Sequence, residues 1–198
     1  MPQFTQREKE QIKEQLLTTA RKLFATKGLK KTSLEELTSS VGIAKSSFYI
    51  FFESKEVLYL ELLDEDGPGI EERVWTVVNE QKTTQDKLKS YLHAMTKELE
   101  ENPLMKRLQT HPEEIQLVAR KVSPEFLQRK TARNIIPLIQ FLEQLKEAGQ
   151  LIDEDIMTIV SFMRAAMTIS RHKEDIGEEQ YPKVAEMMFD AISKYITI

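Results

Sequence analysis

The sequence lacks cysteine altogether, which excludes disulfides, thiolate metal ligands and cysteine nucleophiles and suits a reducing cytoplasm. It also lacks stretches of alternating β-branched residues bounded by turn signals, so strands have little support. Glycine and proline are sparse, with 6 and 7 residues among 198. The rest of the chain is dominated by Glu, Lys, Leu, Gln and Ala, which favour helices. We therefore predict an all-α fold.

Long apolar runs and a secretion signal are missing as well. The chain starts with the polar, charged segment MPQFTQREKE, which does not resemble a signal peptide. The longest nearly apolar stretch, 156–169, contains Arg164 and several hydroxyl residues, so it is too short and too polar to span a bilayer. We expect a cytoplasmic protein without a membrane partner.

Motifs for catalysis and metal binding are also lacking. There is no glycine-rich phosphate loop, no nucleophile elbow and no HExxH motif. His93, His111 and His172 are scattered without the spacing of metal ligands. Adjacent glutamates such as Glu71 and Glu72 are common in this chain and are interpreted as solvated helix faces. We expect neither an enzyme nor a cofactor or metal site.

Charge is distributed unevenly along the chain. The net charge is −4, which alone argues weakly against a nucleic-acid partner, but residues 1–56 carry +3 and the remainder carries −7. A basic head on an acidic body is what a DNA-binding protein with one attachment face requires, because only that face has to neutralise phosphates. The asymmetry is modest, and many domains that bind no nucleic acid vary by as much.

Helical signals fill the first 64 residues. Lys27-Gly28 marks the end of a first helix, because a cation suits the last turn and Gly tolerates the left-handed conformation that follows it. Ser33 and Glu36 form a capping-box pattern that begins a second helix, and Ser54 caps a fourth. The four expected helices lie at about 6–26, 33–41, 45–52 and 55–64.

The remaining residues predict a larger helical bundle. Gly67-Pro68-Gly69 is expected to end the fourth helix. Ser123 followed by Pro124 has the pattern of an N-cap with proline at the first helical position, and Pro137 is expected to kink the helix that it interrupts. The expected helices lie at about 70–81, 84–101, 112–121, 124–147, 153–172 and 178–196.

The segment 34–52 has the pattern of a helix-turn-helix. Two short helices that cross through a tight turn need apolar residues at fixed inward positions, and Gly42 lies where the turn requires an unusual backbone conformation. Lys45, Ser46, Ser47 and Tyr49 then face outward, where small hydroxyls and a lysine reach phosphates or base edges in the major groove. The inward positions are Leu37, Val41, Ile43, Phe48 and Phe51.

Residues 8–60 resemble the TetR family of bacterial regulators. The resemblance rests on 32–37, on Val41-Gly42-Ile43 and on 45–58, and the pattern Tyr-x-x-Phe-x-x-Lys-x-x-Leu at positions 49, 52, 55 and 58 makes it specific. It implies a helix-turn-helix DNA-binding domain of three helices at 1–54, and a larger ligand-binding bundle that dimerises at 55–198.

The family pattern also implies roles for single residues. It makes Tyr49 a phosphate contact and places Lys45, Ser46 and Ser47 on the groove-facing surface. Lys55 would hold a phosphate at the start of the fourth helix, and Thr32 and Ser33 would contact the DNA backbone. Two departures stand out: Thr38 replaces an alanine usual at the helix crossing, and Ile50 replaces a common histidine. Ile50 could alter base preference by meeting a thymine methyl group.

The two last predicted helices carry apolar stripes that are wider than one intramolecular contact needs. TetR relatives use these helices to form a four-helix dimer bundle, and a twofold dimer suits a palindromic DNA site. The alternative is one large monomer core. The residues expected at the interface are Ile156, Val160, Met163, Met167, Tyr181, Val184, Met188 and Ile192.

The resemblance implies an effector pocket enclosed by the helices from 70 to 147. Taken singly, each candidate wall residue is better explained as ordinary core than as a ligand contact. Arg164, in an otherwise apolar helix, would pair with an anionic effector or with a carboxylate across the dimer. The wall candidates are Trp75, Tyr91, Met95, Met105 and Phe141.

These observations predict a ligand-responsive regulator, most simply a repressor that binds a palindromic double-stranded DNA operator as a homodimer and is released by a small-molecule effector. Activation is the alternative if the operator lies elsewhere relative to a promoter. A helical adaptor that binds protein is a further alternative, against which the hydrophilic surface of 45–47 argues, because it lacks the apolar anchors of protein interfaces. An enzyme built in a helical bundle is a more distant one.

Overall fold

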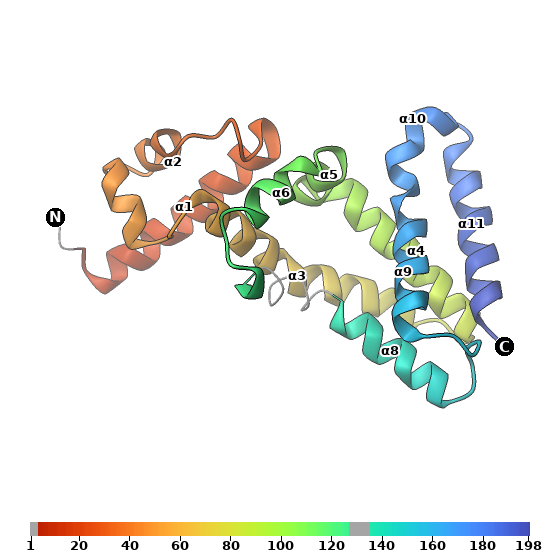
Figure 1. The fold of residues 1–198 in the computed structure, drawn as a ribbon. Helices are drawn as coiled ribbons and strands as arrows, with labels where there is room; N and C mark the ends of the chain where they lie inside the picture. Colours follow the sequence, from red (N-terminus) through yellow and green to blue (C-terminus); the bar gives the residue numbers. More distant parts are fainter. Residues whose placement is uncertain (1–3, 127–134) are drawn as a thin grey trace. The chain divides into compact units, whose positions relative to one another are not determined.

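The computed structural model describes residues 4–126 and 135–198, whose regular secondary structure is helical apart from one isolated bridge between Leu151 and Thr197 (Figure 1). This confirms the all-α class. No helix in the described ranges is long and apolar enough to span a membrane. The elements are α1 (Gln6–Lys27), α2 (Leu34–Ser40), the 3₁₀ helix η1 (Lys45–Ile50), α3 (Lys55–Asn79), α4 (Thr84–Glu101), α5 (Pro103–Thr110), α6 (Glu113–Ala119), α8 (Ile136–Glu147), α9 (Ile156–Met167), the 3₁₀ helix η2 (Thr168–His172), α10 (Lys173–Ile176) and α11 (Tyr181–Ile196).

The chain divides into two compact units. The first, called the head here, comprises Met1–Asp66 and Thr110–Lys130, and the second, called the body, comprises Gly67–Gln109 and Thr131–Ile198. The head is therefore larger than the segment 1–54 assigned from sequence, because it includes the start of α3 and all of α6. Helix α3 contributes residues to both units.

Local capping signals determine where the helices of the head begin and end. Thr5 and Glu8 form a capping box at the start of α1, and Ser33 and Glu36 form another at the start of α2. Gly28 and Gly42 follow these two helices with φ of 84° and 71°, a region that is costly for residues with a Cβ atom. The predicted caps and glycine positions of the head are confirmed.

A small apolar core holds the head together. Phe24 of α1 packs edge-to-face on Tyr59 of α3, with ring centroids 5.3 Å apart. Each large side chain buried in this way stabilises the fold by roughly 1.5–3 kcal/mol. The fully buried members are Leu16, Ala20, Phe24, Leu29, Leu37, Phe48, Leu58, Tyr59 and Leu62.

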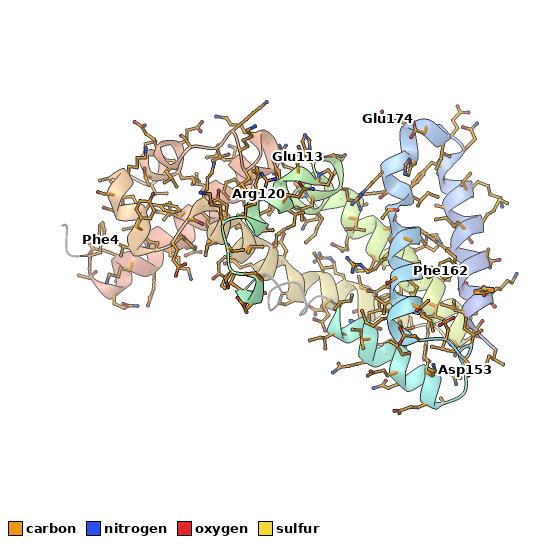
Figure 2. The ribbon with its side chains drawn as sticks, viewed as in Figure 1. Phe4, Glu113, Arg120, Asp153, Phe162 and Glu174 are labelled. Carbon is orange, nitrogen blue, oxygen red and sulfur yellow. The ribbon has the colours of Figure 1, made fainter. Side chains whose placement is uncertain are left out.

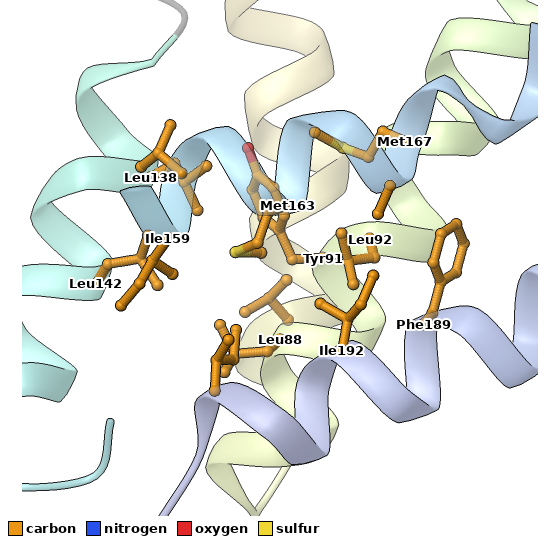
Figure 3. Packing of buried hydrophobic residues seen from close by; sticks show 14 of the residues in the cluster. Leu88, Tyr91, Leu92, Leu138, Leu142, Ile159, Met163, Met167, Phe189 and Ile192 are labelled. Atoms are coloured by element: carbon orange, nitrogen blue, oxygen red, sulfur yellow. The ribbon is translucent and has the colours of Figure 1, made fainter. Parts of the chain in front are cut away.

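The body encloses a second, larger core. Figure 3 shows side chains of α4, α8, α9 and α11 converging on it, with Met163 of α9 and Leu92 of α4 near its centre. Helices α9 and α11 run side by side (Figure 1), and α11 is also tied to α4 by ion pairs of Glu186 with Lys89 at 2.5 Å and with His93 at 2.7 Å.

The prediction that Gly67-Pro68-Gly69 ends a helix is wrong, because α3 continues through it to Asn79. Pro68 is exposed, so its ring lies outside the core, and the missing Cβ of Gly67 removes the side chain that a following proline would hinder. Beyond the proline, the buried positions recur every four residues at Ile70, Val74 and Val78. Burial of this apolar stripe outweighs the local cost of the proline.

Two other elements also differ from the prediction. The third helix of the head is a 3₁₀ helix that ends at Ile50, and a helix at 103–110 was not predicted. This second helix, α5, begins at Pro103 because the Asn102 side chain accepts hydrogen bonds from the N–H groups of Leu104 and Met105, at 3.0 and 3.1 Å.

Pro137 does not kink a long helix. It lies in the first turn of α8, which begins at Ile136, and there its missing N–H costs nothing. Residues 127–134 of the helix predicted at 124–147 lie outside the described residues. The predicted cap at Ser123 is confirmed, since its hydroxyl accepts a hydrogen bond from the Phe126 N–H at 3.1 Å.

The proline inside α3 gives a stability prediction. Pro68→Ala restores a helix donor and removes the clash of the ring with the preceding turn, so we expect the free energy of unfolding to rise by about 1–3 kcal/mol in denaturant titrations. Pro103→Ala is the matched control and is expected to be nearly neutral, because Pro103 occupies the first position of α5. An unchanged or lowered stability of the Pro68 variant would contradict this account of α3.

Candidate nucleic-acid interface and ligand cavity

The 3₁₀ helix η1 presents a polar and aromatic surface to solvent. Lys45 and Ser46 are exposed, and Tyr49 and Ile50 remain 60% and 42% exposed in spite of their size. Three residues per turn place Ser46 and Tyr49 in one line along the helix. Phe48, on the inner side, is fully buried and anchors the element to the head. We call Lys45, Ser46, Tyr49 and Ile50 the η1 face.

Two residues predicted to contact DNA are buried. Ser47 is 4% exposed and Thr32 is 1% exposed, and the Thr32 hydroxyl donates a hydrogen bond to the Gly28 carbonyl oxygen at 2.8 Å. Both side chains therefore support the fold of the head and are not placed to reach a groove. The tighter winding of a 3₁₀ helix turns Ser47 inward, which an α-helical pattern does not anticipate.

Lys55 also differs from its predicted role. Its ammonium group donates hydrogen bonds to the carbonyl oxygens of Leu29 at 2.7 Å and Thr32 at 2.9 Å, so it holds the loop between α1 and α2. The buried carboxylate of Glu114, on α6, accepts a hydrogen bond from the Leu29 N–H at 3.2 Å. The loop is thus held by a cation on one side and an anion on the other.

Sequence reasoning missed Glu114, because Glu113-Glu114 looks like the other solvated glutamate pairs of this chain. The one available signal was the spacing of apolar residues in α6. Val118 lies four positions after Glu114 and is fully buried. That spacing puts Glu114 on the inner face of the helix.

Ser33 stays at the surface of the head. Its hydroxyl accepts a hydrogen bond from the Glu36 N–H at 3.1 Å, and the Glu36 carboxylate pairs with Lys27. The Lys27 hydrogen bond and the Ser33 N–H lower the pKa of Glu36 to about 2, so this carboxylate is ionised at neutral pH. A DNA contact of Ser33 remains a prediction, since the cap alone accounts for it.

A cavity of about 170 Å³ lies within the body. Four of the predicted wall residues, Trp75, Tyr91, Met95 and Met105, line it together. Phe141 lies behind the wall, with its ring centroid 5.1 Å from that of Trp75, and Arg164 is exposed on α9 and does not line the cavity. The remaining wall residues are Gly67, Ile70, Glu71, Val74, Glu98, Leu99, Pro137 and Leu138.

The polar groups of the cavity wall are few. Tyr91 is only 5% exposed, and its hydroxyl makes no hydrogen bond within the described part of the chain. Burial raises the pKa of Tyr91, which the charge of Arg164 partly offsets, so the phenol is protonated at neutral pH. Glu98 accepts two hydrogen bonds from the Arg73 guanidinium, at 2.6 and 2.7 Å, and this contact lowers the pKa of Glu98.

An apolar stripe is exposed along α9 and α11. It is continuous across the two helices, because Phe162 of α9 and Tyr195 of α11 meet edge-to-face with ring centroids 6.1 Å apart. Figure 2 labels Phe162 on α9. The members of this α9–α11 stripe are Met157 (49% exposed), Phe162 (40%), Val184 (38%), Met187 (60%) and Tyr195 (68%).

Most residues predicted at a dimer interface lie elsewhere. Val160, Met163, Met167, Tyr181 and Ile192 are at most 7% exposed and belong to the core of the body. Ile156 and Met188 are half-buried, and Val184 is exposed. The periodicity could not show which part of a wide apolar surface packs within the chain, and an interface on these two helices stays a prediction.

The contacts of Lys55 generate a prediction that separates its two possible roles. Lys55→Met keeps the length of the side chain but removes the ammonium group from the carbonyl oxygens of Leu29 and Thr32. We expect the free energy of unfolding to fall by about 2–4 kcal/mol, measured by denaturant titration. The control Lys45→Met changes an exposed lysine and should leave stability unchanged. If Lys55→Met is as stable as the unaltered chain and only loses DNA affinity, Lys55 is a phosphate contact instead.

Comparisons with known proteins show what this chain is similar to. A family model described as "Bacterial regulatory proteins, tetR family" matches residues 16–62. The uncharacterised HTH-type transcriptional regulator YuxN of Bacillus subtilis (strain 168) is 45% identical over 58 residues, which are 29% of this chain and 19% of that protein. The matched parts therefore span about a fifth of the curated relatives' lengths.

Solved structures share the whole fold. A putative tetR family transcription regulator from Shewanella sp. PV-4 has a TM-score of 0.69 at 18% identity, covering 94% of this chain and 98% of the other. RolR in complex with resorcinol has a TM-score of 0.66 at 15% identity, covering 98% and 91%. By sequence, residues 16–62 are therefore similar to the TetR family of bacterial regulatory proteins, and the chain shares its fold with solved structures described as members of that family.

Proposed function

We propose that this protein is a ligand-responsive transcriptional repressor that binds a palindromic DNA operator as a homodimer and leaves it when a small molecule binds the body. The observation that carries the proposal is the η1 face. It keeps a lysine, a hydroxyl and a tyrosine exposed on an element whose inner side is fixed by Phe48. That arrangement suits the major groove, where exposed polar side chains on a rigid element contact phosphates and base edges.

Dimerisation is assigned to the α9–α11 stripe. Large apolar side chains that remain exposed along two adjacent helices are unfavourable in water, and a second copy of the same stripe would cover them. A twofold axis there would present two heads to one DNA duplex, as half-sites about one helical turn apart require.

The cavity supports a small-molecule effector. RolR, which shares the fold, was solved with resorcinol, so an all-helical chain of this shape can hold a small ring. Helix α3 lines the cavity with Ile70, Val74 and Trp75, and the same helix begins at Lys55 in the head. A ligand that binds better to one position of α3 than to another would shift the population of head arrangements and lower operator affinity.

The first test is recovery of an operator. Selection of bound sequences from a random duplex library, at two salt concentrations, should enrich a palindrome whose affinity falls steeply with salt. Absence of any enriched sequence would favour the helical adaptor, whose head binds protein.

The η1 face gives a sharper test on that operator. Tyr49→Phe and Lys45→Ala should each weaken operator binding by about tenfold without lowering stability, and Lys45→Ala should also reduce the salt dependence. Lys82→Ala, an exposed lysine of the body, is the control and should bind as the unaltered chain does. Unchanged affinity of both η1 variants in gel-shift titrations would refute the assignment.

The α9–α11 stripe predicts the oligomeric state. In a twofold dimer, Met187→Glu would place two negative charges in the interface, one from each copy. We therefore expect a monomer in sedimentation-velocity runs at micromolar concentration. The control Val77→Glu adds the same charge to an exposed apolar residue of α3 and should remain dimeric. A dimer that survives Met187→Glu and Tyr195→Glu together would show that another surface mediates association.

A further inference from the structure

The body cavity has a distinctive wall composition. Among the described residues that line it there is no lysine, arginine or histidine, whereas two carboxylates, those of Glu71 and Glu98, are present. The rings of Trp75 and Tyr91 lie beside each other, with centroids 5.6 Å apart. Aromatic faces and carboxylates both attract positive charge.

The cavity is small. Its volume of about 170 Å³ is close to the ~150 Å³ of an engineered apolar cavity that binds benzene. A single substituted ring therefore fills it without expansion.

The charge balance disfavours anions. Arg73 is already engaged by both oxygens of Glu98, and Glu71 makes no ion pair within the described part of the chain. Because Arg73 balances the charge of Glu98, Glu71 supplies the negative charge that a carboxylate ligand would meet and from which an ammonium group would gain.

Tyr91 indicates that the ligand carries a polar atom. Tyr91 lines the cavity, and its hydroxyl makes no hydrogen bond with the described residues. A ligand group that bonds to this hydroxyl would gain a hydrogen bond there. The phenol oxygen can accept a hydrogen bond from an ammonium N–H.

We propose that the effector of this cavity is a compact protonated amine carried on a single apolar ring, and that carboxylic acids are excluded. This inference rests on the proposed function, since it names the class of ligand to which the regulator responds. It assigns charge selection to Glu71 and the polar contact to Tyr91.

Three probes of matched size test the charge. Benzylammonium, ethylbenzene and benzoate share one ring and differ mainly in being positive, neutral and negative. In calorimetric titrations of the full-length protein without DNA, benzylammonium should bind about tenfold more tightly than ethylbenzene, and benzoate should bind most weakly. Equal affinities of the cation and the neutral probe, tighter binding of benzoate, or no binding of any probe would overturn the proposal.

Matched variants test the residues. Glu71→Gln should weaken benzylammonium binding about fivefold to tenfold and leave ethylbenzene unaffected, because only the charge is lost. Glu72→Gln, one position along α3 and outside the cavity wall, is the control and should change neither. Tyr91→Phe should weaken benzylammonium alone. Loss of both probes in the Glu71 variant, or the same loss in the Glu72 variant, would count against charge selection by Glu71.

Adding operator DNA separates this proposal from the proposed function. If benzylammonium binds as expected but does not release the operator, the ligand class stands and the regulatory function fails. If an operator is found and benzoate binds in place of benzylammonium, the regulatory function stands and the ligand class is wrong.

Discussion

The head depends on two side chains that satisfy backbone groups of the loop between α1 and α2. The half-buried Lys55 ammonium donates to two loop carbonyl oxygens, and the buried Glu114 side chain accepts a hydrogen bond from the Leu29 N–H. Buried backbone groups must find partners, because water is not available to them. These contacts therefore stabilise the loop and, with it, the position of α2 relative to α1.

The sequence predicted those parts of the fold whose signals are local. The capping box at Ser33 was of this kind, as was the glycine at position 42, since a few neighbouring residues determine each of them. The bounds of α4 matched the expected helix to the residue. Pro68 could not be interpreted in the same way, because the burial of Ile70 and Val74 by distant parts of the body decides whether the helix continues.

The sequence predicted the residue types of the candidate site better than it predicted which way their side chains point. The exposure of Lys45, Ser46 and Tyr49 followed from the spacing of their apolar neighbours. The inward turn of Ser47 depends on 3₁₀ winding, and the hydrogen bonds of Lys55 depend on a loop more than 20 residues away in the chain. Four cavity wall residues were named from sequence, but Glu71 and Glu98 were not, since a glutamate facing a cavity and one facing water look alike in a pattern.

Within the six residues of η1, buried and exposed side chains have different roles. Phe48 fixes it to the core, whereas Ser46, Tyr49 and Ile50 touch solvent and contribute little to the core. Substitutions at the exposed positions therefore change surface chemistry at small cost in stability. The chemistry that the η1 face offers to a partner can therefore vary from one sequence to another while the scaffold beneath it stays the same.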